Sequence, residues 1–242
     1  ARWRARNETG GMTQPPFETR ELRAKLLEYL NQKVVDPITG AQRAIGSYKF
    51  GVYAFFDYDK EPIYVGQTAE GIKVRIGRHL TNQRTDAVAM KVLDPYEVYE
   101  VEVWPLAQYD TRATGDREAR DHLNWLEYDI FQHFLAQSHF NAVLNEKDPF
   151  EFPAGSFVRP EGVRGTIVSQ AVFELRNHPD TRIARRAETL SLLAKVVSER
   201  QVQKGLRKTM LTQAKRLAWL AERRLAEFDG QPDDAEEPEK SV

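Results

Sequence analysis

The sequence contains no cysteine, which excludes a disulfide framework and any metal site built on thiolates. It also has no apolar run near the roughly 18 residues that a membrane-spanning helix requires. The basic first six residues are not followed by the hydrophobic region of a signal peptide. These absences suit a cytoplasmic protein without a membrane partner. Apolar residues make up 41% of the chain, which is enough for a real core.

The chain lacks an excess of charge of either sign, because its 35 basic and 36 acidic residues give a net charge of −1. These charges are, however, unevenly distributed along the sequence. Residues 159–226 hold 15 lysines and arginines against six acidic residues, whereas residues 229–242 hold six acidic residues and one lysine. A locally basic segment can bind a polyanion even in a neutral protein, because phosphate contacts depend on local charge. The alternative explanation is an ordinary solvated helical face.

The pattern of apolar residues predicts helices and short strands along the first 150 residues. The expected elements are a helix over 18–31, strands over 49–56 and 62–67 joined as a hairpin, a helix over 72–80, a short helix over 85–93, a strand over 96–104 and a long helix over 116–136. They predict an α/β (α+β) fold: a small, mostly antiparallel three-stranded sheet flanked by helices. A helical C-terminal extension is expected to follow.

Composition divides the chain into six segments. They are an extension over 1–11, excluded from the fold because Met12 resembles a natural start; an N-terminal helical arm over 12–47; a core over 48–147; a connector rich in proline and glycine over 148–165; a basic helical region over 166–228, for DNA binding or oligomerisation; and an acidic, disordered tail over 229–242.

Five features of the core carry candidate chemistry. Gly51-Val52-Tyr53 opens the first strand of the hairpin, and Tyr64-Val65-Gly66 closes the second. Because side chains alternate along a strand, the two phenols can converge on one side of the sheet. Arg75 and His79 are four residues apart, so they share one face of the next helix, and Glu127 lies on the long helix.

Each of these residues alone has a simpler explanation. A strand tyrosine is most often a half-buried packing residue. Arg75 and His79 alone would most often form a solvated helix face, and a single helical glutamate is usually exposed. Their ordered occurrence in one segment favours a functional site.

In this order the motifs resemble the GIY-YIG nuclease superfamily. The resemblance covers about residues 48–145, and valine replaces isoleucine in both tripeptides, which keeps a β-branched side chain. Phe140-Asn141 resembles the aromatic–asparagine pair that follows the acidic residue in the family, so Asn141 joins the candidate catalytic residues. Its spacing from Glu127 is longer than is usual, and Asn145 competes for the same role.

The resemblance implies a metal-dependent DNA endonuclease that hydrolyses phosphodiester bonds. Glu127 would hold one divalent ion per active site, Mg²⁺ or Mn²⁺, and a single carboxylate with several waters suits Mg²⁺. Arg75 would hold phosphate oxygens. Tyr53 would be the general base, coupled to His79 because a free phenol has a pKa near 10. Tyr64 would orient water or phosphate.

Restriction or phage defence is the leading interpretation of the biological role. A free-standing core with extra elements at both ends resembles the restriction members of the superfamily. Such an enzyme must cut both strands with one site per chain, so a homodimer is possible. The alternatives are a repair or non-specific nuclease of the same superfamily and a catalytically silent DNA-binding module.

Overall fold

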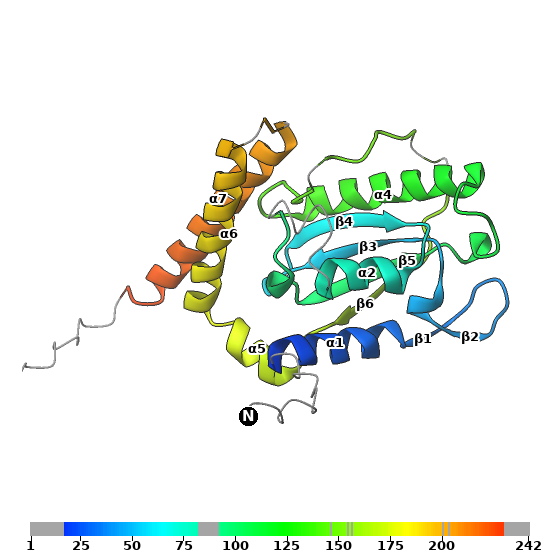
Figure 1. Cartoon of the computed structure of the whole chain (residues 1–242), viewed down its shortest axis with the longest axis horizontal. Helices are drawn as coiled ribbons and strands as arrows, with labels where there is room; N and C mark the ends of the chain where they lie inside the picture. The colour runs from blue at the N-terminus through cyan, green and yellow to red at the C-terminus, as the bar shows by residue number, and fades with distance from the viewer. Residues whose placement is uncertain are drawn as a thin grey trace, which may run out of the picture.

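The protein is built around an antiparallel sheet that lies between two layers of helices (Figure 1). This computed structural model describes residues 17–81, 92–145, 147–153, 155, 157–199, 201–202 and 204–229. The helices are α1 (Phe17–Leu30), α2 (Ile72–Thr81), α4 (Arg117–Gln137), α5 (Gln170–Arg176), α6 (Pro179–Glu199) and α7 (Lys204–Ala226). The strands are β1 (Lys33–Val35), β2 (Gln42–Ala44), β3 (Gly51–Phe56), β4 (Pro62–Thr68), β5 (Glu100–Pro105) and β6 (Val163–Thr166). Short 3-10 helices are η1 (Ile45–Ser47), η2 (Pro95–Glu97) and η3 (Ala107–Tyr109).

The main sheet has the strand order β4-β3-β5-β6, and every neighbouring pair is antiparallel. The mixed α/β class, the antiparallel sheet and the helical C-terminal region are therefore confirmed. Three of these strands are the predicted ones, but among the described residues the sheet has four strands rather than three. The extra strand, β6, lies at the end of the segment that we expected to be a connector. Its four residues alternate only between half-buried and exposed, so no apolar pattern marks it in the sequence.

Each face of the sheet packs against its own helices. On one face α1 and α2 cover side chains such as Tyr53, Phe55 and Val101. On the other face Leu123, Leu126 and Ile130 of α4 pack on alternate residues of the same strands. This arrangement leaves the edge of β4 between α2 and α4, where side chains from all three elements can meet (Figure 1).

Two predicted elements differ in extent. The expected strand over 96–104 begins only at Glu100, because the residues before it form η2, in which Pro95 occupies the first turn and the Asp94 side chain accepts a hydrogen bond from the Tyr96 amide. The predicted helix over 85–93 lies mostly outside the described residues, and the expected segments 1–11 and 229–242 do so almost entirely.

The N-terminal segment 12–47, which the sequence predicts to be a helical arm, also contains two strands. After α1 the chain forms an antiparallel hairpin of β1 and β2, in which Lys33 pairs with Ala44 and Val35 with Gln42. The hairpin leads through η1 into β3. It lies at the end of the main sheet where β4 ends, away from the helical hairpin of α6 and α7 at the opposite end (Figure 1).

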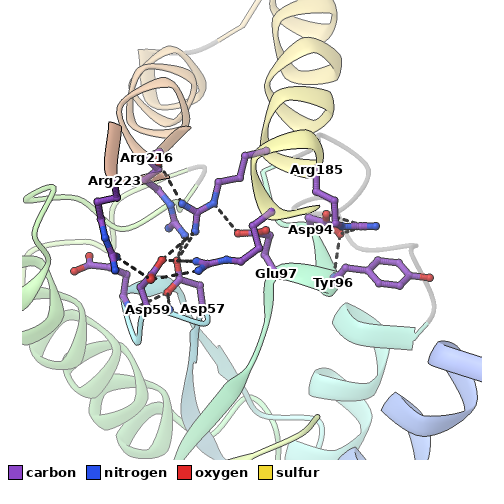
Figure 2. Close-up of polar contacts among 11 residues, drawn as sticks. Asp57, Asp59, Asp94, Tyr96, Glu97, Arg185, Arg216 and Arg223 are labelled. Carbon is purple, nitrogen blue, oxygen red and sulfur yellow. Dashed lines mark hydrogen bonds and ion pairs between the residues drawn. The ribbon is translucent and has the colours of Figure 1, made fainter. Parts of the chain in front are cut away.

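The C-terminal helices dock on the β3–β4 turn through a buried ion network (Figure 2). The Asp57 carboxylate accepts hydrogen bonds from Arg186 at 2.8 Å and from Arg216 at 2.5 Å. Arg186 also donates to Glu97 at 2.9 Å, and Asp59 pairs with Arg182. All three arginines are buried.

This network gives a structural explanation for part of the positive charge of the basic segment. Arg182, Arg186 and Arg216 are committed to carboxylates of the core, and Arg223 also pairs with Asp59 at 3.3 Å. Part of the local positive charge therefore stabilises the docking of α6 and α7. Less of it is left for a nucleic acid than the sequence suggests.

Candidate active site

The two motif tyrosines lie on the same face of the sheet. In the register of β3 and β4, Tyr53 pairs with Gly66 and Phe55 pairs with Tyr64. Tyr53 and Tyr64 are therefore diagonal neighbours, and their ring centroids are 6.3 Å apart. The predicted convergence of the phenols follows from this register, and Tyr53 is fully buried.

The glycines of both tripeptides make room for close contacts. A Cβ atom at Gly66 would lie 2.7 Å from the Tyr53 hydroxyl and 2.8 Å from the Tyr64 ring. A Cβ atom at Gly51 would lie 2.9 Å from Ile72 of α2. Separations below 3 Å force neighbouring atoms to move. Gly66 therefore sets the position of both phenols, and Gly51 lets α2 approach the sheet.

Replacing Gly66 by alanine should destabilise the protein by about 1–3 kcal/mol, because the extra methyl group overpacks a fully buried site. Cleavage should fall as well, since both tyrosines must shift. Chemical denaturation and a cleavage assay would measure the two effects. Gly77→Ala in α2 is the matched control for stability, because nothing lies within 4 Å of its Cβ position. It should be neutral or stabilise α2 by about 0.5–1 kcal/mol. Equal stabilities of the two variants would contradict the steric role of Gly66.

Arg75 and His79 both reach the tyrosines from α2. The Arg75 Nε donates a hydrogen bond to the Tyr53 hydroxyl at 3.3 Å. The His79 ring lies 5.8 Å from the Tyr53 ring and 5.2 Å from the Tyr64 ring, measured between centroids. The structure thus brings these four predicted residues into one cluster.

His79 is buried and neutral at physiological pH. Burial, and then Arg75 and Arg78, lower its pKa to about 3. Neither of its ring nitrogens has a hydrogen-bond partner among the residues that the structure describes. The Tyr53 hydroxyl contacts Arg75 and not His79, so no hydrogen bond joins the pair that we expected to exchange a proton.

The environment of Tyr53 favours its protonated form. Burial, and then the neighbouring Tyr64, raise the pKa of Tyr53 well above its usual value of 10, against the opposing effect of Arg75. In this arrangement the phenol keeps its proton at neutral pH. A role as a base therefore requires a further cation or a proton acceptor nearby.

Glu127 approaches the edge of β4 from α4. Its carboxylate accepts a hydrogen bond of 2.8 Å from the Gln67 amide, which also donates to Asn124 at 2.9 Å. Burial raises the pKa of Glu127 to about 7, although Gln67, Arg75 and Arg120 act in the opposite direction. Glu127 therefore titrates near neutral pH, where an added positive charge would hold it ionised.

The two candidate asparagines occupy different environments. Asn145 donates to the Val65 carbonyl at 2.7 Å and accepts from the Val65 amide at 3.1 Å, which ties it to the second tyrosine motif. Asn141 is exposed in the loop after α4, at a positive φ of 49°. No contact joins its side chain to the cluster in the part of the chain that the structure describes. The geometry favours Asn145 for a place at the site.

An open cleft of about 610 Å³ lies beside this cluster. Arg75, Arg78 and Arg120 line it, together with Gln67 and the loop that precedes α4. Arg78 also pairs with Glu70 at 2.8 Å. Three guanidinium groups in one cleft suit the non-bridging oxygens of phosphates.

The donor set fits a weakly held, hydrated metal ion. No group of three or more histidine, aspartate and glutamate side chains that could bind a metal occurs among the described residues. Glu127 is accompanied by Gln67, whose buried Oε1 has no hydrogen-bond partner in the described parts of the chain. One carboxylate with one amide oxygen suits Mg²⁺, which keeps much of its hydration shell.

Sequence reasoning missed Gln67, Arg78 and Arg120. Gln67 directly follows the Tyr-Val-Gly tripeptide, and this position is the one feature of the sequence that could have marked it as a site residue. Arg78 lies between the two α2 residues that we singled out, but nothing distinguishes it from a solvated arginine. Arg120 precedes Glu127 by seven residues, which is two helical turns, so both lie on one face of α4.

The cluster combines phenolic, cationic and acidic groups of the kinds that phosphodiester hydrolysis uses. Residues 49–123 match the family model described as the GIY-YIG catalytic domain, and this match supports membership of the GIY-YIG endonuclease superfamily. The match includes both tyrosine motifs, Arg75 and His79, and it ends before Glu127. Neither a curated protein nor a solved structure matches the chain.

The domain indicates a nuclease that hydrolyses phosphodiester bonds, and it implies DNA as the substrate. Nucleases of this family generally use a divalent metal ion. None of the described helices has the length and apolar character needed to cross a membrane.

Proposed function

We propose that the protein is a DNA endonuclease that depends on one Mg²⁺ or Mn²⁺ ion per active site and acts in restriction or phage defence. The observation that carries the catalytic part is the meeting of Tyr53, Tyr64, Arg75 and His79 beside Glu127, next to a cleft lined by arginines. A catalytically silent module would have no physical need for a half-buried glutamate with a pKa near 7 at that place.

Glu127 would hold the metal ion, with the Gln67 oxygen as a neighbouring acceptor. The bound ion would polarise the phosphate and assist the leaving oxygen. Arg75 sits between the Tyr53 hydroxyl and the cleft, so it can bind a non-bridging oxygen while it keeps the phenol in place. Arg78 and Arg120 would hold phosphates on either side of the scissile bond.

Tyr53 would take the proton of the attacking water, which requires it to lose its own proton first. Arg75 is the cation in contact with the phenol and favours the phenolate. His79 lies close to both tyrosine rings. Burial lowers its pKa to about 3, so it would accept the phenol proton only once the negative charge of a bound phosphate raises that pKa. Tyr64 would orient the water or the phosphate.

A restriction role would place the protein in the cytoplasm with the DNA. It would also require either a homodimer or two successive nicks, since each chain has one site. The exposed lysines and arginines of α6 and α7 remain candidates for phosphate contacts or for the subunit interface. We propose Asn145 rather than Asn141 as the asparagine of the site, because it bonds to both backbone groups of Val65.

Digestion of plasmid DNA tests this proposal. With Mg²⁺ or Mn²⁺ the wild-type protein should give discrete fragments with phosphate and hydroxyl ends, and excess EDTA should stop the reaction. Glu127→Gln is the inactive control. A smear or simple nicking would point to a repair or non-specific nuclease. Binding without any cleavage, in either metal, would indicate a silent DNA-binding module.

A further inference from the structure

We propose that the hairpin of β1 and β2, residues 33–44 and hereafter the hairpin arm, enters the major groove of the DNA duplex next to the cleft and contributes to the choice of cleavage site. This inference rests on the proposed nuclease function. It assigns a DNA-reading role to a segment outside the region that matches the family model.

The hairpin arm emerges where the cleft opens. Arg43 of β2 forms an ion pair with Asp110, just after η3. The chain then continues through Arg112, whose carbonyl accepts a hydrogen bond from Lys49, to the loop at Thr114 that lines the cleft. In Figure 1 the hairpin lies at the end of the sheet where β4 ends, which is also the end at which α4 begins, and α6 and α7 lie at the other end. A duplex held in the cleft would therefore pass the hairpin arm.

The turn of the hairpin arm is held in one shape. The Asp36 carboxylate accepts hydrogen bonds of 2.9 Å from the amides of Ile38 and Thr39, and the Asp36 amide donates to the Ala41 carbonyl at 2.9 Å. Gly40 supplies the positive φ of 70° that the turn needs. Isolated two-stranded hairpins are marginally stable. These bonds keep the tip ordered although no core covers it.

The exposed surface of the hairpin arm suits DNA. Val35 is 61% exposed and Ile38 is 64% exposed, so neither side chain serves the core. Asp36 is the sole carboxylate between residues 33 and 44, and it is buried. The exposed surface therefore carries Lys33, amide and hydroxyl groups such as Gln42, and apolar groups, but no negative charge. Apolar side chains contact thymine methyl groups, and glutamine can bond to adenine.

The dimensions of a two-stranded ribbon match the major groove. That groove admits a β-ribbon and is about 8.5 Å deep. The two steps of β1 from Lys33 to Val35 extend roughly 7 Å at about 3.3 Å per residue, and the turn with Ile38 projects beyond them. The tip can therefore reach base edges while the cleft arginines hold phosphates. Phosphate contacts fix position, and base contacts select sequence.

Ile38→Asp tests the proposal, because it places a negative charge at the tip without touching the core. Leu175→Asp is the matched control: Leu175 is 55% exposed on α5, outside the helices that remain candidates for phosphate contacts, and the change in charge is the same. Ile38→Asp should raise KM for duplex cleavage by about tenfold or more and alter the preference among substrates with randomised flanking sequences. Leu175→Asp should leave both within about twofold, since distant charges are screened at physiological salt. Thermal unfolding of both variants should match the wild type.

Binding to the same duplex should be measured in a Glu127→Gln background, so that affinity is separated from cleavage. If Ile38→Asp retains the wild-type KM, affinity and preference, the hairpin arm does not contact DNA. If its activity is lost because a dimer dissociates, as sedimentation would show, the hairpin arm is a subunit interface and the proposal is wrong. A wild-type protein that binds duplex through Ile38 but does not cut it would overturn the nuclease function and not the role of the hairpin arm.

Discussion

Replacing Glu127 by glutamine should abolish DNA cleavage and, at the same time, stabilise the protein at pH 8. Activity is lost because the amide cannot hold the divalent ion that the reaction requires. Stability rises because the wild-type carboxylate is half-buried, so its ionisation at pH 8 destabilises the folded state relative to the unfolded state. Glutamine keeps the shape of the side chain and removes that charge. The opposite signs of the two effects identify a residue that is kept for function at the expense of stability.

The pH dependence of this stability gain follows from the raised pKa. The pKa of Glu127 rises from 4.5 in the unfolded chain to about 7 in the folded protein. The folded state therefore binds this proton more tightly, and the resulting stabilisation is fully present below pH 4.5 and is lost as the pH rises through 7. At pH 8 the loss is roughly 2 kcal/mol, with an allowance for partial exposure. The free energy of unfolding of Glu127→Gln should therefore exceed that of the wild type at pH 8 and equal it at pH 4.

Urea denaturation in EDTA, at both pH values, measures this difference. Glu222→Gln, on the exposed surface of α7, should show no such dependence and serves as the control. Cleavage at wild-type rate by Glu127→Gln would remove Glu127 from the mechanism. A stability difference that did not change with pH would show that burial does not raise the pKa of this carboxyl group.

The tyrosine cluster could be predicted from the sequence because its geometry is local. Two strands joined by a short turn can pair in few registers, and side-chain alternation then places Tyr53 and Tyr64 on one face. Arg75 and His79 share a helix face by their spacing alone. Such relations depend on periodicity and not on how distant elements pack, so the sequence is sufficient for them.

The other half of the site depends on packing between distant elements. Gln67 meets Glu127 because α4 crosses the β4 edge at that point, and no pattern in either segment specifies this crossing. Likewise, Asn145 rather than Asn141 bonds to Val65 because of the course of the loop after α4. The proton transfer between Tyr53 and His79 looked plausible from the pKa values of free side chains, but burial moves the two pKa values apart.

The basic C-terminal segment shows a further limit of sequence reasoning. A count of charges in the sequence cannot distinguish an arginine that is free to bind a phosphate from one that is paired with a carboxylate. Arg186 and Arg216 are separated from Asp57 by more than 120 residues, and their pairing depends on the docking of α6 and α7. Figure 2 shows Arg216 and Asp57 side by side at the β3–β4 turn, and Arg186 of α6 donates to the same carboxylate. A basic segment can therefore be explained by ion pairs within the chain as well as by binding to a nucleic acid.

Asp57→Asn should cause the largest loss of stability among single substitutions in this network. Asp57 is 1% exposed, and its carboxylate accepts hydrogen bonds from two buried arginines and from the amides of Asp59 and Glu61. Without its charge Arg186 and Arg216 remain buried and poorly compensated, which typically costs about 3–5 kcal/mol. Urea denaturation at pH 7 measures the change.

Asp180→Asn is the matched control for this experiment. Asp180 also pairs with an arginine, Arg224, through two hydrogen bonds of 2.9 and 3.0 Å, but it lies on the surface, so its loss should have little effect. Asp57 directly follows the strand that carries Tyr53, and the turn it caps leads into the strand that carries Tyr64. Undocking of α6 and α7 should therefore also lower cleavage in conditions where the core remains folded. If Asp57→Asn and Asp180→Asn were equally stable, the ion network would not hold the C-terminal helices on the core.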